Sequence, residues 1–286
     1  MKFTVEILTG MGNVLKALIS ALSIAETNIL PRLDFHADGD YAKILDDSLI
    51  CHGDDEFGTN SFVTARWLIL KEEELEQPDL INDTKVWGDH PNIEDKSLAH
   101  LFSTHTIDWF FDRNLISDKV YERIQNGIKK IKWTDRVLSE VEKISSHFEG
   151  PLLSVQIRTW GHSGDPANCI NIQDGVPRKY SFEEYKNAIN KFLPEVKTIF
   201  ITSDNDSILP EYIDYLKDWA ASSKSHAHNV KVVTYPRPAN LTLLQHSAAS
   251  MLLGSKSDML VCNRISTFAE CMWWFGECKA TTIPVG

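Results

Sequence analysis

Polar side chains suited to binding an anion follow several short apolar runs in the second half of the chain. The runs LLSVQI, TIFIT and DMLVC each end just before such residues. In an open sheet of parallel strands, ligands bind beyond the carboxyl ends of the strands. We therefore expect one ligand site to gather the polar residues at these ends, which are Arg158, Ser203, Asp204, Asn263, Ser266 and Thr267.

Arg158 follows the run LLSVQI and is a candidate both for catalysis and for binding a diphosphate. A guanidinium keeps its positive charge and presents several donors in one plane, which suits a diphosphate group. The alternative is a structural arginine that pairs with a carboxylate. Its position at the end of a predicted strand favours the functional role.

Ser203 and Asp204 follow the run TIFIT. An aspartate at this place can accept hydrogen bonds from a ribose hydroxyl or from the N–H edge of a purine. A helix is predicted directly afterwards, and Ser and Asp are also good helix N-caps. Because Ser203, Asp204 and Asp206 cannot all be the cap, both roles stay open.

The last predicted helix begins among Asn263, Ser266, Thr267 and Phe268. Free backbone N–H groups and the positive end of the helix dipole favour an anion there, and two hydroxyls add donors. Capping is the alternative role. Thr267 and Glu270 match the capping-box pattern, whereas an alanine stands three residues after Ser266.

His162 and Asp165 lie in a polar, glycine-containing stretch that is predicted to be a long loop after Arg158. Either side chain can transfer a proton, so both are candidate catalytic residues, with an ordinary loop role as the alternative. Arg237, between two prolines, is a weaker candidate for the nucleotide or acceptor side. Asn240 is predicted to be a helix N-cap.

Gly10, Gly12 and Asn13 lie near the start of the chain, between an apolar run and a helical pattern. The glycines predict a tight strand-to-helix turn that lets a ligand approach the backbone, with Asn13 projecting into a cleft. The third glycine of a dinucleotide-binding fingerprint is missing, and no acidic residue stands at a clear strand end about 20 residues later. A dinucleotide site is therefore not predicted.

From Gly150 onward, short apolar runs alternate with helical patterns. This alternation predicts an α/β fold with a parallel, doubly wound sheet. The predicted strands are 152–157, 198–202, 230–235, 258–262 and 280–285, and the predicted helices are 182–193, 209–220, 241–253 and 267–275. The first half is less regular, with a strand over 3–8, a helix after it, and two further helices over 117–131 and 133–148.

Composition excludes some classes of function. The chain has 286 residues, 43% of them hydrophobic, and a formal net charge of −11. Such an acidic protein lacks the clustered cations that nucleic-acid binding needs. No apolar run approaches the roughly 20 residues of a membrane span, and the five cysteines show no metal-ligand spacing. We expect a soluble, cytoplasmic protein with free thiols and no metal site.

Four stretches of the sequence together resemble one family. GMGNVLKALISALSIAE, VQIR, FITSDN and NRISTFAECMWWFG occur in the order seen in the GDP-fucose-dependent fucosyltransferases, which include α-1,2-, α-1,6- and protein O-fucosyltransferases. The matching stretches cover the first 30 residues and most of 150–286. In this family a histidine usually stands where Gln156 stands here, and an aspartate usually follows the arginine more closely than Asp165 does.

The resemblance implies a GT-B-like fold of two Rossmann-like domains that face a central cleft. Residues 1–149 would form the acceptor-side domain and residues 150–286 the domain that binds the nucleotide sugar. It implies an inverting transfer of fucose from GDP-fucose to a glycan hydroxyl, with no metal cofactor. The transition state would be oxocarbenium-like, so the charge of the leaving group is what the enzyme must stabilise.

The resemblance also implies roles for single residues. Arg158 would hold the β-phosphate, and Asp204 would meet guanine or ribose. Asn13 would lie on the sugar side. The diphosphate site would be lined by Ser266, Thr267 and Phe268. Two other interpretations stay open: a transferase that uses another nucleotide sugar, and a binding module that has lost catalysis.

Overall fold

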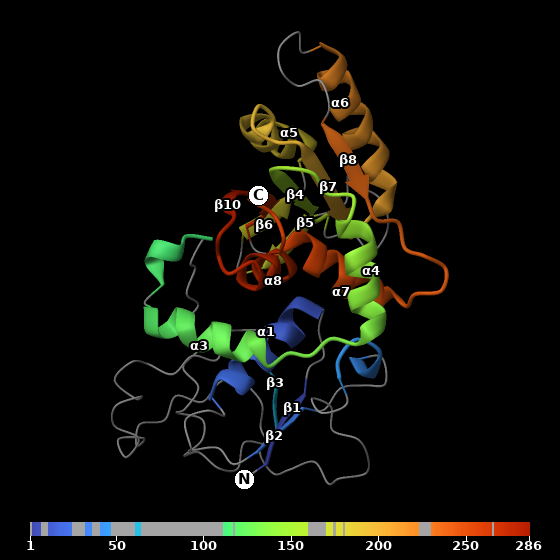
Figure 1. Cartoon of the computed structure of the whole chain (residues 1–286). Helices are drawn as coiled ribbons and strands as arrows, with labels where there is room; N and C mark the ends of the chain where they lie inside the picture. Colours follow the sequence, from blue (N-terminus) through green and yellow to red (C-terminus); the bar gives the residue numbers. More distant parts are fainter. Residues whose placement is uncertain are drawn as a thin grey trace. The chain divides into compact units, whose positions relative to one another are not determined.

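The computed structural model describes most of the second half of the chain and separate segments of the first (Figure 1). The described residues are 2–6, 11–24, 32–35, 41–46, 61–63, 111–116, 118–159, 170–173, 176–179, 181–222, 230–264 and 266–286. The chain divides into two compact units, Met1–Val137 and Leu138–Gly286. The two units are described separately below.

A five-stranded sheet in which all strands are parallel forms the centre of the second unit (Figure 1). In the described residues the strands lie in the order β10-β9-β4-β7-β8. Their bounds are β4 Leu152–Ile157, β7 Thr198–Ser203, β8 Lys231–Thr234, β9 Met259–Asn263 and β10 Thr281–Val285. The predicted strands and the parallel sheet are therefore confirmed.

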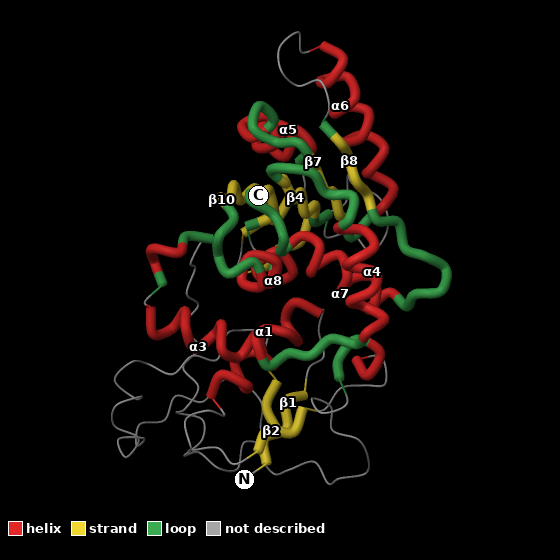
Figure 2. Tube along the Cα trace, in the orientation of Figure 1, coloured by secondary structure: helices red, strands yellow, loops and turns green. Residues whose placement is uncertain are grey.

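Helices cover both faces of this sheet (Figure 2). Leu153, Val155 and Ile157 of β4 share one buried cluster with residues of α5 (Phe182–Phe192) and α6 (Leu209–Ser222). Because alternate side chains of a strand point to opposite faces, Ser154 and Gln156 face the other side. There, α7 (Leu243–Gly254) packs against β4 and β7, and against α8 (Thr267–Phe275). All six residues of β4 are buried, and four of them are apolar, as is usual for a strand covered on both faces.

The strand order locates the expected ligand site. From β4 the chain moves outward through β7 to β8, and then returns to place β9 and β10 on the other side of β4. This is the strand order of nucleotide-binding Rossmann folds, and the order reverses between β4 and β9. Ligands of such sheets bind at the carboxyl ends of the strands beside this reversal.

Helix α4 (Asp135–Ser145) contains the boundary between the two units. Its Glu140 is buried and accepts a hydrogen bond from the hydroxyl of Tyr235, with 3.2 Å between the oxygens. Three residues after the helix, Phe148 packs its ring on Phe200 of β7. The sequence-based division between residues 149 and 150 stays a prediction.

The first unit has a smaller parallel sheet in its described residues, with the order β2-β1-β3. Its strands are β1 Lys2–Glu6, β2 Arg32–Phe35 and β3 Ser61–Val63. Its helices are α1 Met11–Ile24 and α3 Asp118–Lys129, which pack together, and the 3₁₀ helices η2 Tyr41–Lys43 and η6 Arg113–Leu115. The predicted opening of strand and helix is confirmed, and the two later helices lie where the sequence predicted them.

The glycine turn predicted before the first helix is partly wrong. Helix α1 begins at Met11, so Gly12 and Asn13 belong to its first turn. The reason is that Met11 is itself buried and extends the apolar stripe of Val14 and Leu15 by one turn. Gly10 lies outside the described residues, and so does the side chain of Asn13.

The loop predicted after Arg158 contains a β-hairpin. Strands β5 (Ile170–Gln173) and β6 (Val176–Lys179) pair antiparallel. Asp174 and Gly175 stand between them, and Asp-Gly is a preferred pair for two-residue hairpin loops. The prediction of one long loop was wrong because the strands are only four residues long and half of their residues are polar.

The N-cap of α7 is Thr242, and the prediction of Asn240 was wrong. The Thr242 hydroxyl accepts from the Gln245 N–H at 3.2 Å, and the Gln245 side chain accepts from the Thr242 N–H at 3.1 Å. This reciprocal capping box satisfies two helix donors at once, which Asn240 cannot do from outside the first turn.

We expect Thr242→Ala to lower the free energy of unfolding by about 1 kcal/mol, because it removes the cap of α7. Asn240→Ala is the matched control and should change it by less than about 0.5 kcal/mol, since Asn240 is exposed. Urea unfolding followed by circular dichroism measures both values. A larger loss for Asn240→Ala than for Thr242→Ala would contradict this assignment of the cap.

Candidate active site at the carboxyl end of the parallel sheet

Arg158 leaves the sheet at the carboxyl end of β4, as predicted. Its guanidinium forms an ion pair with Asp204 from the end of the neighbouring strand β7, with 2.9 Å between Nη1 and Oδ2. The side chain of Arg158 is 34% exposed and that of Asp204 is 19% exposed. The arginine is thus paired with a carboxylate. If its guanidinium also contacts a phosphate, Asp204 already sets the orientation of that guanidinium.

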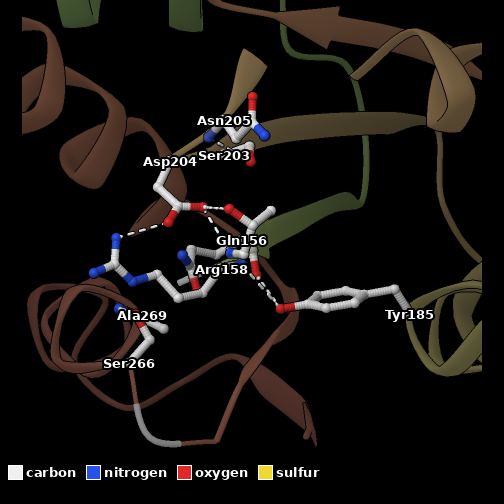
Figure 3. Close-up of polar contacts among 9 residues, drawn as sticks. Gln156, Arg158, Tyr185, Ser203, Asp204, Asn205, Ser266 and Ala269 are labelled. Atoms are coloured by element: carbon white, nitrogen blue, oxygen red, sulfur yellow. Dashed lines mark hydrogen bonds and ion pairs between the residues drawn. The ribbon is translucent and has the colours of Figure 1, made fainter. Parts of the chain in front are cut away.

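The carboxylate of Asp204 is the meeting point of three donors (Figure 3). Besides Arg158, the backbone N–H of Thr159 donates to Oδ1 at 2.7 Å, and the Thr159 hydroxyl donates to the same oxygen at 3.1 Å. Thr159 is fully buried. Asp204 therefore fixes both the guanidinium and the backbone that follows it, and its predicted contact with guanine or ribose stays a prediction.

Neither Ser203 nor Asp204 caps the helix that follows. Asn205 is the N-cap of the 3₁₀ helix η8 (Asp206–Ile208), and its side chain accepts from the Ser207 N–H at 3.1 Å. The Ser203 hydroxyl accepts from the Asn205 N–H at 3.0 Å. The capping alternative considered for Ser203 and Asp204 is thus wrong, because Asn205 has the extended backbone that an N-cap needs.

The backbone of Arg158 is held by a side chain from helix α5. The Tyr185 hydroxyl accepts a hydrogen bond from the Arg158 N–H at 3.2 Å and donates one to the Gln156 carbonyl at 3.1 Å (Figure 3). Tyr185 is only 2% exposed. One buried hydroxyl therefore bonds two backbone groups at the strand end, and the Arg158 N–H, beyond the last pair of β4 with β9, would be costly to leave unpaired.

Helix α8 begins beside this strand end. Its N-cap is Ser266, whose hydroxyl accepts from the Ala269 N–H at 3.4 Å. The alternative that Thr267 caps the helix is wrong, because Thr267 already has its place as the first residue of the helix. The N–H groups of Thr267 and Phe268 make no hydrogen bond among the described residues. They are the unpaired donors of a helix N-terminus, which favour an anion.

Arg158 and the start of α8 are brought together by the sheet. They follow β4 and β9, which are neighbours on either side of the reversal in strand order. Figure 3 shows the Arg158 side chain extending between Asp204 and the first turn of α8 at Ser266 and Ala269. Asn263 is the last residue of β9 and is 3% exposed. The predicted cluster of Arg158, Asp204 and Ser266 thus shares one edge of the sheet.

Other predicted site residues lie outside what the structure describes. His162 and Asp165 fall in the undescribed stretch after Thr159, and Gly10 falls in the one before α1. Gly12 and Asn13 belong to the first unit. Their predicted roles stay predictions.

Sequence reasoning missed two contributors to this site, Thr159 and Tyr185, and one unusual atom. The Oε1 atom of Gln156 is buried and has no hydrogen-bond partner among the described residues. Gln156 lies on the same face of the sheet as Arg158, two residues before it. The alternation of β4 indicated that face, but nothing in the sequence indicated that the amide oxygen would lack a partner.

The described residues contain neither a metal-binding cluster nor a membrane-spanning helix. No group of three or more His, Cys, Asp and Glu side chains there has the arrangement of a metal site. No helix in this part of the chain has the length and apolar character to cross a membrane. The three cysteines that are described, Cys262, Cys271 and Cys278, are buried and form no disulfide bond. Burial raises the pKa of the Cys262 thiol well above its usual range.

Several solved fucosyltransferase structures are similar to this chain, although no family model matches the sequence and no curated protein matches it. POFUT1 in complex with GDP aligns over 100% of this chain and 98% of its own, with 12% identity and a TM-score of 0.51. A mutant of Arabidopsis thaliana FUT1 with GDP aligns over 96% and 68%, with 14% identity and a TM-score of 0.55.

The α-1,6-fucosyltransferase NodZ, soaked with GDP-fucose, aligns over 96% of this chain and 92% of its own, with 14% identity and a TM-score of 0.52. A crystal structure of the fucosyltransferase NodZ from Bradyrhizobium aligns over 94% of this chain and 92% of its own, with 14% identity and a TM-score of 0.51. The chain has the fold of GDP-fucose-dependent fucosyltransferases. The predicted resemblance and the predicted α/β, GT-B-like fold class are thereby confirmed.

We expect Asp204→Asn to lower the free energy of unfolding by about 1.5–3 kcal/mol, because it removes the charge on which three donors converge. Asp206→Asn, at an exposed aspartate two residues later, is the control and should cost less than about 0.5 kcal/mol. Urea unfolding of both variants measures the difference. If both variants lost the same small free energy of unfolding, the hydrogen bonds to the Asp204 carboxylate would not stabilise the protein in solution.

We expect Gln156→Met to leave the free energy of unfolding unchanged or to raise it by up to about 1 kcal/mol. Methionine has a similar volume, and the substitution removes a buried oxygen that has no hydrogen bond. Ser154→Ala, at the other unpaired buried oxygen of β4, should behave in the same way. A clear loss of stability in Gln156→Met would mean that the amide has a protein partner.

Proposed function

We propose that this protein is a glycosyltransferase that transfers fucose from GDP-fucose to a glycan hydroxyl with inversion of the anomeric centre. One observation carries the proposal: Arg158 lies beside the open N-terminus of α8, where the strand order reverses. Proteins of this fold were solved with GDP and GDP-fucose, which supports a GDP-sugar as the donor.

The chemistry needs positive charge at the leaving group. The acceptor oxygen forms a bond to the anomeric carbon while the bond from that carbon to the β-phosphate oxygen breaks. GDP leaves with the electron pair, and the acceptor proton passes to a base or to solvent. The Arg158 guanidinium and the N–H groups of Thr267 and Phe268 would stabilise the charge that develops on the diphosphate.

The remaining predicted contacts belong to the same proposal. Ser203 and Asp204 would line the nucleoside side, and the start of α8 with Asn263, Ser266, Thr267 and Phe268 would line the diphosphate. Gly10, Gly12 and Asn13 would contact the sugar from the first unit. His162 and Asp165 are the candidates for the base. Because an arginine and a helix N-terminus supply the positive charge, we propose that transfer requires no metal and that chelation by EDTA leaves its rate unchanged.

We expect Arg158→Ala to weaken GDP binding by about 1.5–3 kcal/mol, the value of a charged hydrogen bond. Arg136→Ala, at an exposed arginine in the first turn of α4, is the matched control and should leave binding unchanged. Isothermal titration calorimetry with GDP and GDP-fucose, in the presence of EDTA, measures the affinities. No binding at millimolar concentration, or equal affinities in all variants, would refute the proposed site.

A panel of nucleotide sugars then tests the donor. Preference for GDP-fucose in thermal-shift measurements supports the proposal, whereas preference for a uridine or GDP-mannose donor would assign a different transferase. Slow hydrolysis of the preferred donor without acceptor would show that the site is catalytic. Tight donor binding without any hydrolysis or transfer would instead assign a binding module.

A further inference from the structure

Tyr185 lies at the place where β4 and β9 separate. The last paired residues of these two strands are Gln156 and Cys262. On the other side of β4, the Ile157 carbonyl still accepts from the Asp204 N–H, in the direction of β7. Backbone groups of successive residues in a strand point to alternate sides, so the Gln156 carbonyl and the Arg158 N–H point towards β9.

The Tyr185 hydroxyl takes the place of β9 at the Arg158 N–H, because the Asn263 carbonyl, which would be the next acceptor on β9, instead accepts from the Ser266 N–H. It donates to the Gln156 carbonyl at 3.1 Å and accepts from the Arg158 N–H at 3.2 Å. A single side-chain oxygen thus replaces one step of the ladder. The position of the Tyr185 ring is set by packing, because the residue is 2% exposed and its ring lies edge-on against that of Tyr212 in α6.

This contact complements the one made by Asp204. Asp204 holds the guanidinium of Arg158 and the backbone of Thr159, and Tyr185 holds the backbone N–H of Arg158 itself. The two residues come from α5 and from the end of β7, so Arg158 is fixed from two directions. We infer that Tyr185 is a positioning residue, which sets where Arg158 leaves the sheet and so aims its guanidinium at the diphosphate.

This inference rests on the proposed function for its ligand, but the hydrogen bond can be tested alone. Tyr185→Phe removes only the hydroxyl. Tyr212→Phe is the matched control, since it removes a hydroxyl from a buried tyrosine of the same aromatic cluster. Hydrogen exchange of the Arg158 amide, followed by NMR, should become about tenfold faster in Tyr185→Phe and stay unchanged in Tyr212→Phe.

GDP affinity, measured by calorimetry, then tests the role in positioning. Tyr185→Phe should weaken GDP binding about tenfold in the otherwise natural chain and have no effect when Arg158→Ala is also present. A merely structural role would give the same loss in both backgrounds. Unchanged amide exchange and affinity in Tyr185→Phe, or equal losses in both backgrounds, would overturn the inference.

The two proposals fail in different ways. If the natural chain binds no GDP, the proposed function is wrong, and the exchange rate of the Arg158 amide alone decides whether Tyr185 holds it. If the natural chain binds GDP and the Tyr185→Phe variant binds it equally well, the proposed function stands and the positioning role is wrong.

Discussion

The site depends on one constraint. The fully buried strand β4 is followed directly by Arg158, and the positive charge of this arginine needs a partner at the edge of the sheet. Asp204 meets this constraint with a carboxylate that accepts from the Arg158 guanidinium and from both donors of Thr159. The pair links the ends of β4 and β7, so the adjacent strand ends and the charged group form one unit. A flexible surface arginine would lose rotamer entropy on binding a ligand, and an arginine already held loses less.

The same strand end combines satisfied and unsatisfied groups. Tyr185 and Asp204 pair the backbone around Arg158, which makes this region rigid. The N–H groups of Thr267 and Phe268 have no partner among the described residues, and the Gln156 Oε1 atom is buried without one. Unpaired donors beside a fixed cation are the arrangement that favours an anionic ligand, because the protein need not reorganise when the ligand arrives.

Much of the second unit could be predicted because its signals are local. The runs LLSVQI and TIFIT are mostly apolar, as is usual for strands buried on both faces, and their bounds were predicted to within a residue or two. The helix over 267–275 was predicted at its observed bounds. The β5–β6 hairpin was not predicted because its strands have only four residues each, half of them polar, although Asp174-Gly175 was a signal for it.

The sequence by itself determined which residues stand at the strand ends, since strand periodicity and polar breaks are properties of neighbouring residues. It thereby identified Arg158, Asp204 and Ser266 as parts of one edge. Only the tertiary structure decided how they interact. Arg158 and Asp204 are 46 residues apart in the chain, and their pairing depends on adjacent strands in register. Tyr185 reaches β4 only because α5 packs over the place where β4 and β9 separate, and hydrogen bonds require distances near 3 Å that no local pattern encodes.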